Sequence, residues 1–149
     1  MRLMVCAAIC LFSALAAGED VVVKEAWARA TSPGQKTASV YLEIVSSADA
    51  MLIGAKCAVA KSAQMHAMRV EDGVMKMRAV QRIALPARKT VKLAPGGLHI
   101  MLAGVARPLV ENETIPLELT IETSGGVTSK LGVQVEVRAI AADAHGHAH

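Results

Sequence analysis

The feature that most constrains the fold is a series of short segments in which apolar and polar residues alternate. In the clearest of them, over 130–140, leucine or valine occupies every second position from Leu131 to Val137. This period of two is typical of a β-strand with one buried face. Similar segments lie at 21–30, 38–45 and 116–122, and turn signals rich in Gly and Pro lie at 32–34, 72–73, 95–97 and 124–126. Many short strands at this spacing predict an all-β antiparallel sandwich or barrel.

The composition fits a single domain with an aliphatic core. The chain has 149 residues, of which 53% are hydrophobic and 2% are aromatic. A chain of this length is enough for one domain, and one this apolar is not intrinsically disordered. The formal net charge of +3 is mild, and one Trp, one Tyr and one Phe cannot supply the repeated stacking platforms of a nucleic-acid surface. We therefore expect no nucleic-acid partner.

The N-terminus is typical of a secretory signal peptide. Arg2 precedes an apolar run over 3–18 that ends in small residues and is shorter than the roughly 20 residues of a membrane-spanning helix. We predict a signal peptide over 1–16, with cleavage after Gly18 as the alternative. The mature protein is then exported to the bacterial periplasm and has no membrane span. We expect it to consist of one domain over 17–140.

The cysteines argue against a disulfide scaffold or a lipid anchor. Cys6 and Cys10 leave with the signal peptide, and neither follows the small residue expected before a lipid-modified cysteine. The remaining Cys57 has no partner for an internal disulfide. Its apolar neighbours predict a buried side chain rather than a reactive thiol.

Methionine and histidine gather in two parts of the chain. Outside the predicted signal peptide, five of the six methionines lie between positions 65 and 101, and all five histidines lie either in that window or at the C-terminus. Methionines that only filled a core would be spread over all the strands. Thioether sulfur is a soft, neutral ligand that selects Cu(I), and imidazole suits both Cu(I) and Cu(II). The clustering therefore predicts a copper site.

The window is expected to contain a β-hairpin that turns at Asp72–Gly73. A two-residue loop pairs Met68 with Met77, Val70 with Met75 and His66 with Ala79. Because side chains two residues apart share a face of a strand, one face then carries His66, Met68, Met75 and Met77, and the other Arg69, Lys76 and Arg78. Further along, His99 and Met101 form a second pair of donors two residues apart.

The spacing of four donors is specific. His66, Met77, His99 and Met101 follow the pattern H-x10-M-x21-H-x-M. This pattern resembles the motif of the PCu(A)C family of periplasmic copper chaperones. The resemblance extends over most of the expected domain and includes WARAT at 27–31, YLEI at 41–44, DGVMKMR at 72–78 and APGGLHIML at 94–102.

The resemblance implies a cupredoxin-like, antiparallel Greek-key β-sandwich or barrel that binds Cu(I) near one end. It implies that His66, Met77, His99 and Met101 are the metal ligands. Met68 and Met75 are additional soft groups, which we expect to be auxiliary to the site, either exchanging with its ligands or only shielding it. The implied role is copper delivery and copper homeostasis. The implied partner is a copper-accepting protein, either a cytochrome c oxidase subunit during oxidase assembly or another periplasmic copper chaperone.

The C-terminal segment 141–149 is expected to be a flexible tail. His145, His147 and His149 alternate there and are suited to a loose Cu(II) site. A solvated tail without a metal-binding role is the alternative interpretation.

Four other functions compete with copper delivery. A metal-free adhesive or interaction sandwich would bind no Cu(I). A copper storage protein or buffer would need the same ligands. A blue-copper electron carrier needs a Cys thiolate with two His, and Cys57 has no closely following His. We expect no enzyme, because the chain has no catalytic Cys/His pairing or phosphate loop, and cleavage at either predicted position leaves no N-terminal His for a copper monooxygenase.

Overall fold

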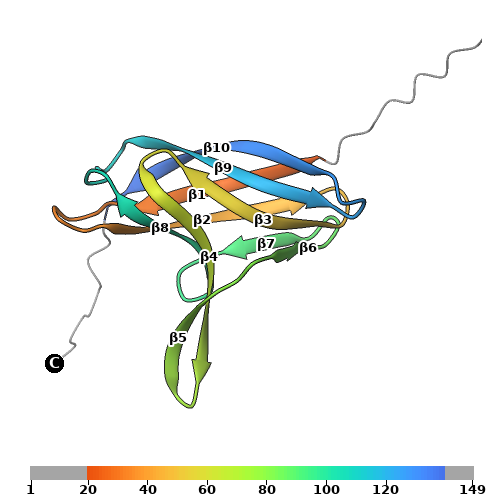
Figure 1. Cartoon of the computed structure of the whole chain (residues 1–149), viewed down its shortest axis with the longest axis horizontal. Helices are drawn as coiled ribbons and strands as arrows, with labels where there is room; N and C mark the ends of the chain where they lie inside the picture. The colour runs from red at the N-terminus through yellow and green to blue at the C-terminus, as the bar shows by residue number, and fades with distance from the viewer. Residues whose placement is uncertain (1–19, 140–149) are drawn as a thin grey trace, which may run out of the picture.

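The computed structural model describes residues 20–139, and all the regular structure of that part of the chain is β-strand (Figure 1). The ten strands are β1 (Val21–Arg29), β2 (Thr37–Ser46), β3 (Ala50–Cys57), β4 (Ala60–Glu71), β5 (Val74–Ala79), β6 (Ile83–Leu85), β7 (Thr90–Leu93), β8 (Leu98–Val105), β9 (Thr114–Thr123) and β10 (Thr128–Arg138). Residues 20–139 contain no helix long and apolar enough to cross a membrane. The predicted signal peptide and the tail histidines His145, His147 and His149 lie outside the described residues.

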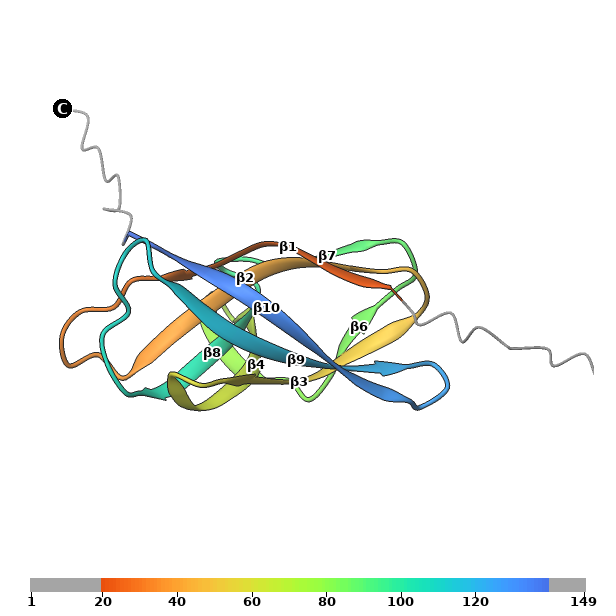
Figure 2. The ribbon, with the colours of Figure 1, turned by 90° about the horizontal axis from the view of Figure 1, so that it is seen from above.

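The strands form one hydrogen-bonded sheet in the order β5-β4-β8-β2-β1-β10-β9-β3-β6, with β7 paired to β2 beyond the end of β8. The predicted antiparallel arrangement is correct for all the pairings in residues 20–139 except one. β1 runs parallel to β10, with Trp27 opposite Glu136. A parallel neighbour cannot be joined by a tight hairpin, so alternation within single strands could not reveal this pairing. The view from above shows the long strands running obliquely along the body (Figure 2).

A single aliphatic core holds the two halves of the sheet together. Its largest fully buried side chains come from five strands and one loop, and include Leu42, Leu52, Leu85, Ile100, Leu109, Ile115 and Leu119. In β10, Val133, Val135 and Val137 are buried whereas the residues between them are exposed. The alternation in the sequence therefore predicted the buried face of this strand correctly.

A bulge in β1 changes the face on which Trp27 lies. Up to Lys24, β1 pairs with β2 in one register, and from Trp27 onward the register is shifted by one residue. Glu25 lies inside this bulge with a positive φ of 50°. The extra residue reverses the alternation, so Ala28 faces the core and Trp27 lies on the outer face beside Tyr41.

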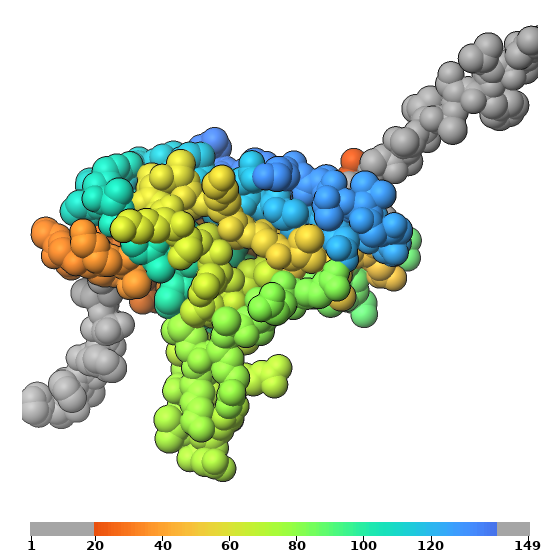
Figure 3. All heavy atoms as spheres, in the orientation of Figure 1, coloured from red at the N-terminus to blue at the C-terminus, as the bar shows by residue number. Residues whose placement is uncertain are grey.

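The hairpin of β4 and β5 projects from the body. β4 pairs with β8 as far as Ala67 and continues beyond it, paired only with β5. We call residues 68–77 the arm; Figures 1 and 3 show that it stands clear of the other strands. Asp72 and Gly73 form its two-residue turn with φ values of 53° and 75°, as a type I′ turn requires. The predicted hairpin and its pairing of Met68 with Met77 are confirmed.

Candidate metal site

Two imidazoles meet on the outer face of the sheet, where the arm leaves the body. His66 in β4 and His99 in β8 are directly paired across the two strands. Their ring centroids are 5.6 Å apart, with the rings at 69° to each other. His99 is 3% exposed, whereas His66 is half-buried. Two histidines separated by 33 positions are therefore brought together by strand register alone.

Each ring has one nitrogen bound to a neighbour and one nitrogen free. His99 Nδ1 lies 3.1 Å from the carbonyl oxygen of Gly97, and His66 Nε2 lies 3.3 Å from Gln64 Oε1. Because these oxygens accept, both ring nitrogens donate, which leaves the unprotonated lone pairs on His66 Nδ1 and His99 Nε2. Both of these atoms are buried and have no hydrogen-bond partner.

This arrangement suits a metal ion. A buried acceptor without a partner costs about 1–3 kcal/mol. A histidine that binds a metal usually donates its other ring N–H to a carbonyl oxygen, which fixes the tautomer. His99 has that arrangement through Gly97. Burial lowers the pKa of His66, and the neighbouring His99 lowers it further. Both effects favour the neutral imidazole that a metal requires.

Methionines flank the imidazole pair on the same face. Met101 follows His99 by two residues and lies opposite Gln64, so it is diagonal to His66 on one side. Met77 lies opposite Met68 and is diagonal to His66 on the other side. Diagonal neighbours are about 7–8 Å apart, within reach of long side chains. The strand register thus places all four residues of the spaced motif on one face, with His66 at the centre.

Met68, which the sequence analysis treats only as an auxiliary group, lies next to the imidazole pair. It is two residues from His66 on the same face, and its backbone N–H donates to the Gly97 carbonyl at 3.2 Å. The same carbonyl accepts the hydrogen bond from His99. Met68 and His99 are therefore diagonal neighbours across β4 and β8.

Two aromatic side chains form a wall of the site that the sequence did not reveal. The Tyr41 ring lies 6.3 Å from the ring of His99, and the Trp27 ring lies 4.7 Å from that of Tyr41. The bulge at Glu25 puts Trp27 there, and bulges leave no simple signal in an alternating sequence. Gln64 was also not expected, although its place two residues before His66 puts it on the same face.

The residues of the spaced motif differ in burial. His99 is packed under Tyr41 and His66, so its removal leaves a space as well as removing a candidate ligand. Met77, in contrast, is 45% exposed, and its replacement leaves no such space.

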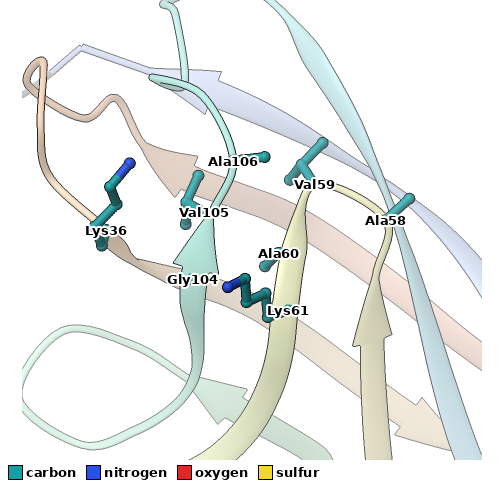
Figure 4. A pocket seen from close by; sticks show the side chains of 8 residues that line it. All are labelled: Lys36, Ala58, Val59, Ala60, Lys61, Gly104, Val105 and Ala106. Carbon is teal, nitrogen blue, oxygen red and sulfur yellow. The ribbon is translucent and has the colours of Figure 1, made fainter.

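A hollow of about 450 Å³ lies away from the imidazole pair, between the start of β4 and the end of β8, with Lys36 and Lys61 at its edge (Figure 4). Its other lining residues are Gly, Ala and Val, so it contains no metal-binding side chain. Within residues 20–139, no three His, Cys, Asp or Glu side chains gather to hold an ion. The strand register places thioethers beside the imidazole pair.

Solved structures with similar folds include copper-binding domains. The copper-bound PCuAC domain from PmoF2 is 26% identical, with a TM-score of 0.65 over 80% of this chain and 93% of that domain. The Cu(I) form of DR1885 from Deinococcus radiodurans is 28% identical, with a TM-score of 0.50 over 78% of each chain. The expected all-β, cupredoxin-like fold is confirmed.

Sequence comparison identifies the family. Residues 21–137 match the model described as "Putative lipoprotein LpqE-like". "Putative lipoprotein Lxx21020" from Leifsonia xyli subsp. xyli is 34% identical over 119 residues, which are 79% of this chain and 70% of that protein. The chain belongs to the LpqE-like family.

Proposed function

We propose that this protein is a copper chaperone that binds Cu(I) at the root of the arm and delivers it to an acceptor protein. The ligands in this proposal are His66, Met77, His99 and Met101, which we call the root site. The observation that carries the proposal is the pair of facing imidazoles, each with a buried, unpartnered ring nitrogen. Mixed nitrogen and thioether donors favour Cu(I) over harder ions such as Mg²⁺.

Similar proteins support this choice of metal. The solved structures with this fold include the copper-bound PCuAC domain from PmoF2 and the Cu(I) form of DR1885. The match covers most of this chain in both cases. The four donors of the root site all lie on the same face of adjacent strands, although the motif spreads them over 36 positions.

A site on an outer face suits transfer better than storage. Met77 is 45% exposed and lies on β5, which is an edge strand of the sheet formed by residues 20–139. An acceptor can therefore approach one ligand of the ion while the buried His99 still holds it. Neutral thioethers carry no charge that would have to be separated on release. A cytochrome c oxidase subunit or a second copper chaperone is the acceptor class that we propose.

A blue-copper electron carrier is the weaker alternative. Such a site needs a thiolate beside two imidazoles. Cys57 is buried in the core at the end of β3, where its thiol donates to the carbonyl oxygen of Pro116 at 3.1 Å. It lies on neither of the strands that carry the imidazoles.

The direct test is an anaerobic Cu(I) titration against a competing chelator, followed by X-ray absorption to count sulfur and nitrogen neighbours. We expect one tightly bound Cu(I) with both sulfur and nitrogen neighbours, and His66→Ala should weaken it. His66 is half-buried, so the variant is expected to fold. Val110→Ala, an exposed residue outside the site, is the matched control. Absence of Cu(I) binding, or a shell without sulfur, would contradict the proposal.

We further propose that the protein is exported and that its histidine tail captures Cu(II). The tail and the signal peptide rest on the sequence alone. Deletion of 141–149 should remove a second, weaker Cu(II) equivalent and leave Cu(I) binding unchanged. The intact mass of the exported protein distinguishes cleavage after Ala16 from cleavage after Gly18, and would also reveal a lipid on a retained cysteine.

A further inference from the structure

The arm carries three methionines that no packing requirement explains. Met75 and Met77 are 54% and 45% exposed, and Met68 is half-buried. None belongs to the buried core, which is built almost wholly from Val, Leu, Ile and Ala. Every residue of β5 is exposed. Exposed methionines at this density are therefore not acting as flexible core filler.

Strand register puts these three sulfurs together. Met68 and Met77 are direct cross-strand partners, so their Cβ atoms lie about 4.5–5.5 Å apart. Met75 lies opposite Val70, on the same face and diagonal to Met68. The side chain of methionine has three rotatable bonds, which lets three thioethers from two strands converge on one point.

The opposite face of the arm has a different chemistry and holds the hairpin in shape. Glu71 receives two hydrogen bonds from the Arg78 guanidinium, at 2.9 and 3.1 Å, and pairs with Lys76 at 3.3 Å. These cations lower the pKa of the Glu71 carboxyl. The charges are thus confined to one face, and the other face presents sulfur with Val70 and no ionised group.

We propose that Met68, Met75 and Met77 form a second soft-metal site, the arm site, which takes up a monovalent Cu(I)-class ion through three thioether sulfurs. Three neutral thioethers select a soft monovalent ion. The role that we infer for the site, loading and unloading the root site, rests on the proposed function, whereas metal binding by the three methionines does not.

The geometry supplies a route between the two sites. Met77 belongs to both, and Met68 is a diagonal neighbour of His99 through the shared Gly97 carbonyl. An ion held by three sulfurs on the arm can exchange Met75 for an imidazole nitrogen while Met77 stays bound. Only metal–ligand bonds form and break in this step. The ion stays monovalent, so no oxidant, reductant or proton is needed.

The test is a titration of the full chain with Ag(I), a soft monovalent ion that is stable in air, followed by NMR of ¹³C-labelled methionine methyl groups. Met75 is the decisive reporter because it belongs only to the arm site. We expect its methyl signal to shift together with those of Met68 and Met77, while the signal of buried Met65 stays in place. A Met75 signal that does not move at saturating Ag(I) overturns the proposal.

Two variants separate this proposal from the proposed function. In His66→Ala/His99→Ala the root site loses both nitrogens, yet the three arm methyl groups should still shift. If they do not, the arm site is wrong and the root site stands. Should this variant fail to fold, the Met75 signal of the wild-type chain still decides the question. If wild-type Ag(I) shifts the arm but leaves the imidazole signals of His66 and His99 unchanged, the proposed function is wrong and the arm site stands.

A matched pair of variants tests the role of Met75 itself. Loss of a direct ligand should cost at least as much as loss of a group that only hydrogen-bonds to a ligand, which lowers affinity by about 10- to 100-fold. Met75→Leu should therefore weaken Ag(I) binding to the root-site double variant by that factor. Met51→Leu, which changes a methionine on β3 remote from the arm, should have no effect. Equal affinities for the two variants would overturn the three-sulfur site.

Discussion

The body and the arm of this protein use similar apolar side chains for opposite purposes. In the body, inward-facing residues such as Leu119 and Ile100 are fully buried and hold two halves of a sheet together. In the arm, Val74 and Met75 are more than half exposed, and they lie on the edge strand β5. Hydrophobic burial is the main favourable term in folding. The arm contributes little hydrophobic burial, so burial does not explain why its exposed residues are apolar.

The choice of side chain differs between the two regions in a way that fits this reading. Rigid, branched residues fill the core, where shape decides packing. Four of the five methionines between 65 and 101 lie on the outer face of the sheet, on the arm or beside the imidazoles, and only Met65 joins the core. Sulfur thus concentrates where a ligand can be reached and is scarce where packing alone is needed.

The largest expected difference between body and arm is in the free energy of unfolding that a substitution removes. Leu119→Ala, in the core, should lower the free energy of unfolding by about 2–5 kcal/mol. Val74→Ala, on the arm, should change it by less than about 0.5 kcal/mol, because the side chain is already 57% exposed. Urea denaturation of both variants measures the difference. A comparable loss in Val74→Ala would mean that the arm packs against something in solution.

The next largest effect concerns copper. Met77→Leu keeps the size and apolar character of an exposed side chain and removes one thioether. Cu(I) affinity should fall by about 10- to 100-fold, the range typical when a metal site loses a supporting group. The urea midpoint should not change. The competing-chelator titration provides the affinity, and an unchanged value would remove Met77 from the root site.

The strands and the hairpin could be predicted because their information is local. Alternation located β2, β9 and β10 to within a few residues, and Asp72–Gly73 determined the register of the arm. The parallel pairing of β1 with β10 could not be predicted, since it joins the two ends of the domain. The bulge at Glu25 could not be predicted either, because one extra residue in a strand leaves no distinctive residue type in the sequence.

Candidate ligands could be chosen from the sequence, but their environment could not be predicted. Clustering and spacing singled out His66 and His99, yet only the structure shows that their rings face each other. The unequal burial of the two rings depends on Tyr41, which belongs to a different strand and carries no metal-binding group. The sequence also ranked Met68 with Met75, whereas the register puts Met68 next to both imidazoles.

A smaller effect tests whether the turn of the arm sets the position of its methionines. Gly73 has a φ of 75°, where an added Cβ meets no neighbouring atom within 4 Å but the backbone conformation disfavours any L-residue. Gly73→Ala should therefore cost about 1 kcal/mol and loosen the pairing of Met68 with Met77. Gly132→Ala, in β10, also meets open space and lacks the positive φ, so it should have no such cost. Hydrogen exchange of the Lys76 and Arg78 amides, whose N–H groups face β4 in the hydrogen-bonded pairs on either side of the Met68–Met77 pair, compares the two variants. Equal exchange would show that the register does not depend on this turn.

The smallest effect on Cu(I) affinity is expected for Cys57→Ser. The sulfur of Cys57 is buried in the core of the body, whereas the proposed ligand sulfurs lie on the arm and beside the imidazoles. Burial raises the pKa of the Cys57 thiol above its ordinary value of 9.0. In the unfolded chain the thiol ionises at about that ordinary value. Above this pH the folded state still holds a proton that the unfolded chain has lost, so the free energy of unfolding falls as pH rises. Cys57→Ser should remove this alkaline loss and leave Cu(I) affinity unchanged. Urea unfolding at neutral and alkaline pH measures the stability, and the copper titration measures the affinity.

A different result would contradict this assignment. An intense thiolate absorption band with Cu(II) that disappears in Cys57→Ser would show that the sulfur of Cys57 binds the metal, which would reverse the contrast between body and arm.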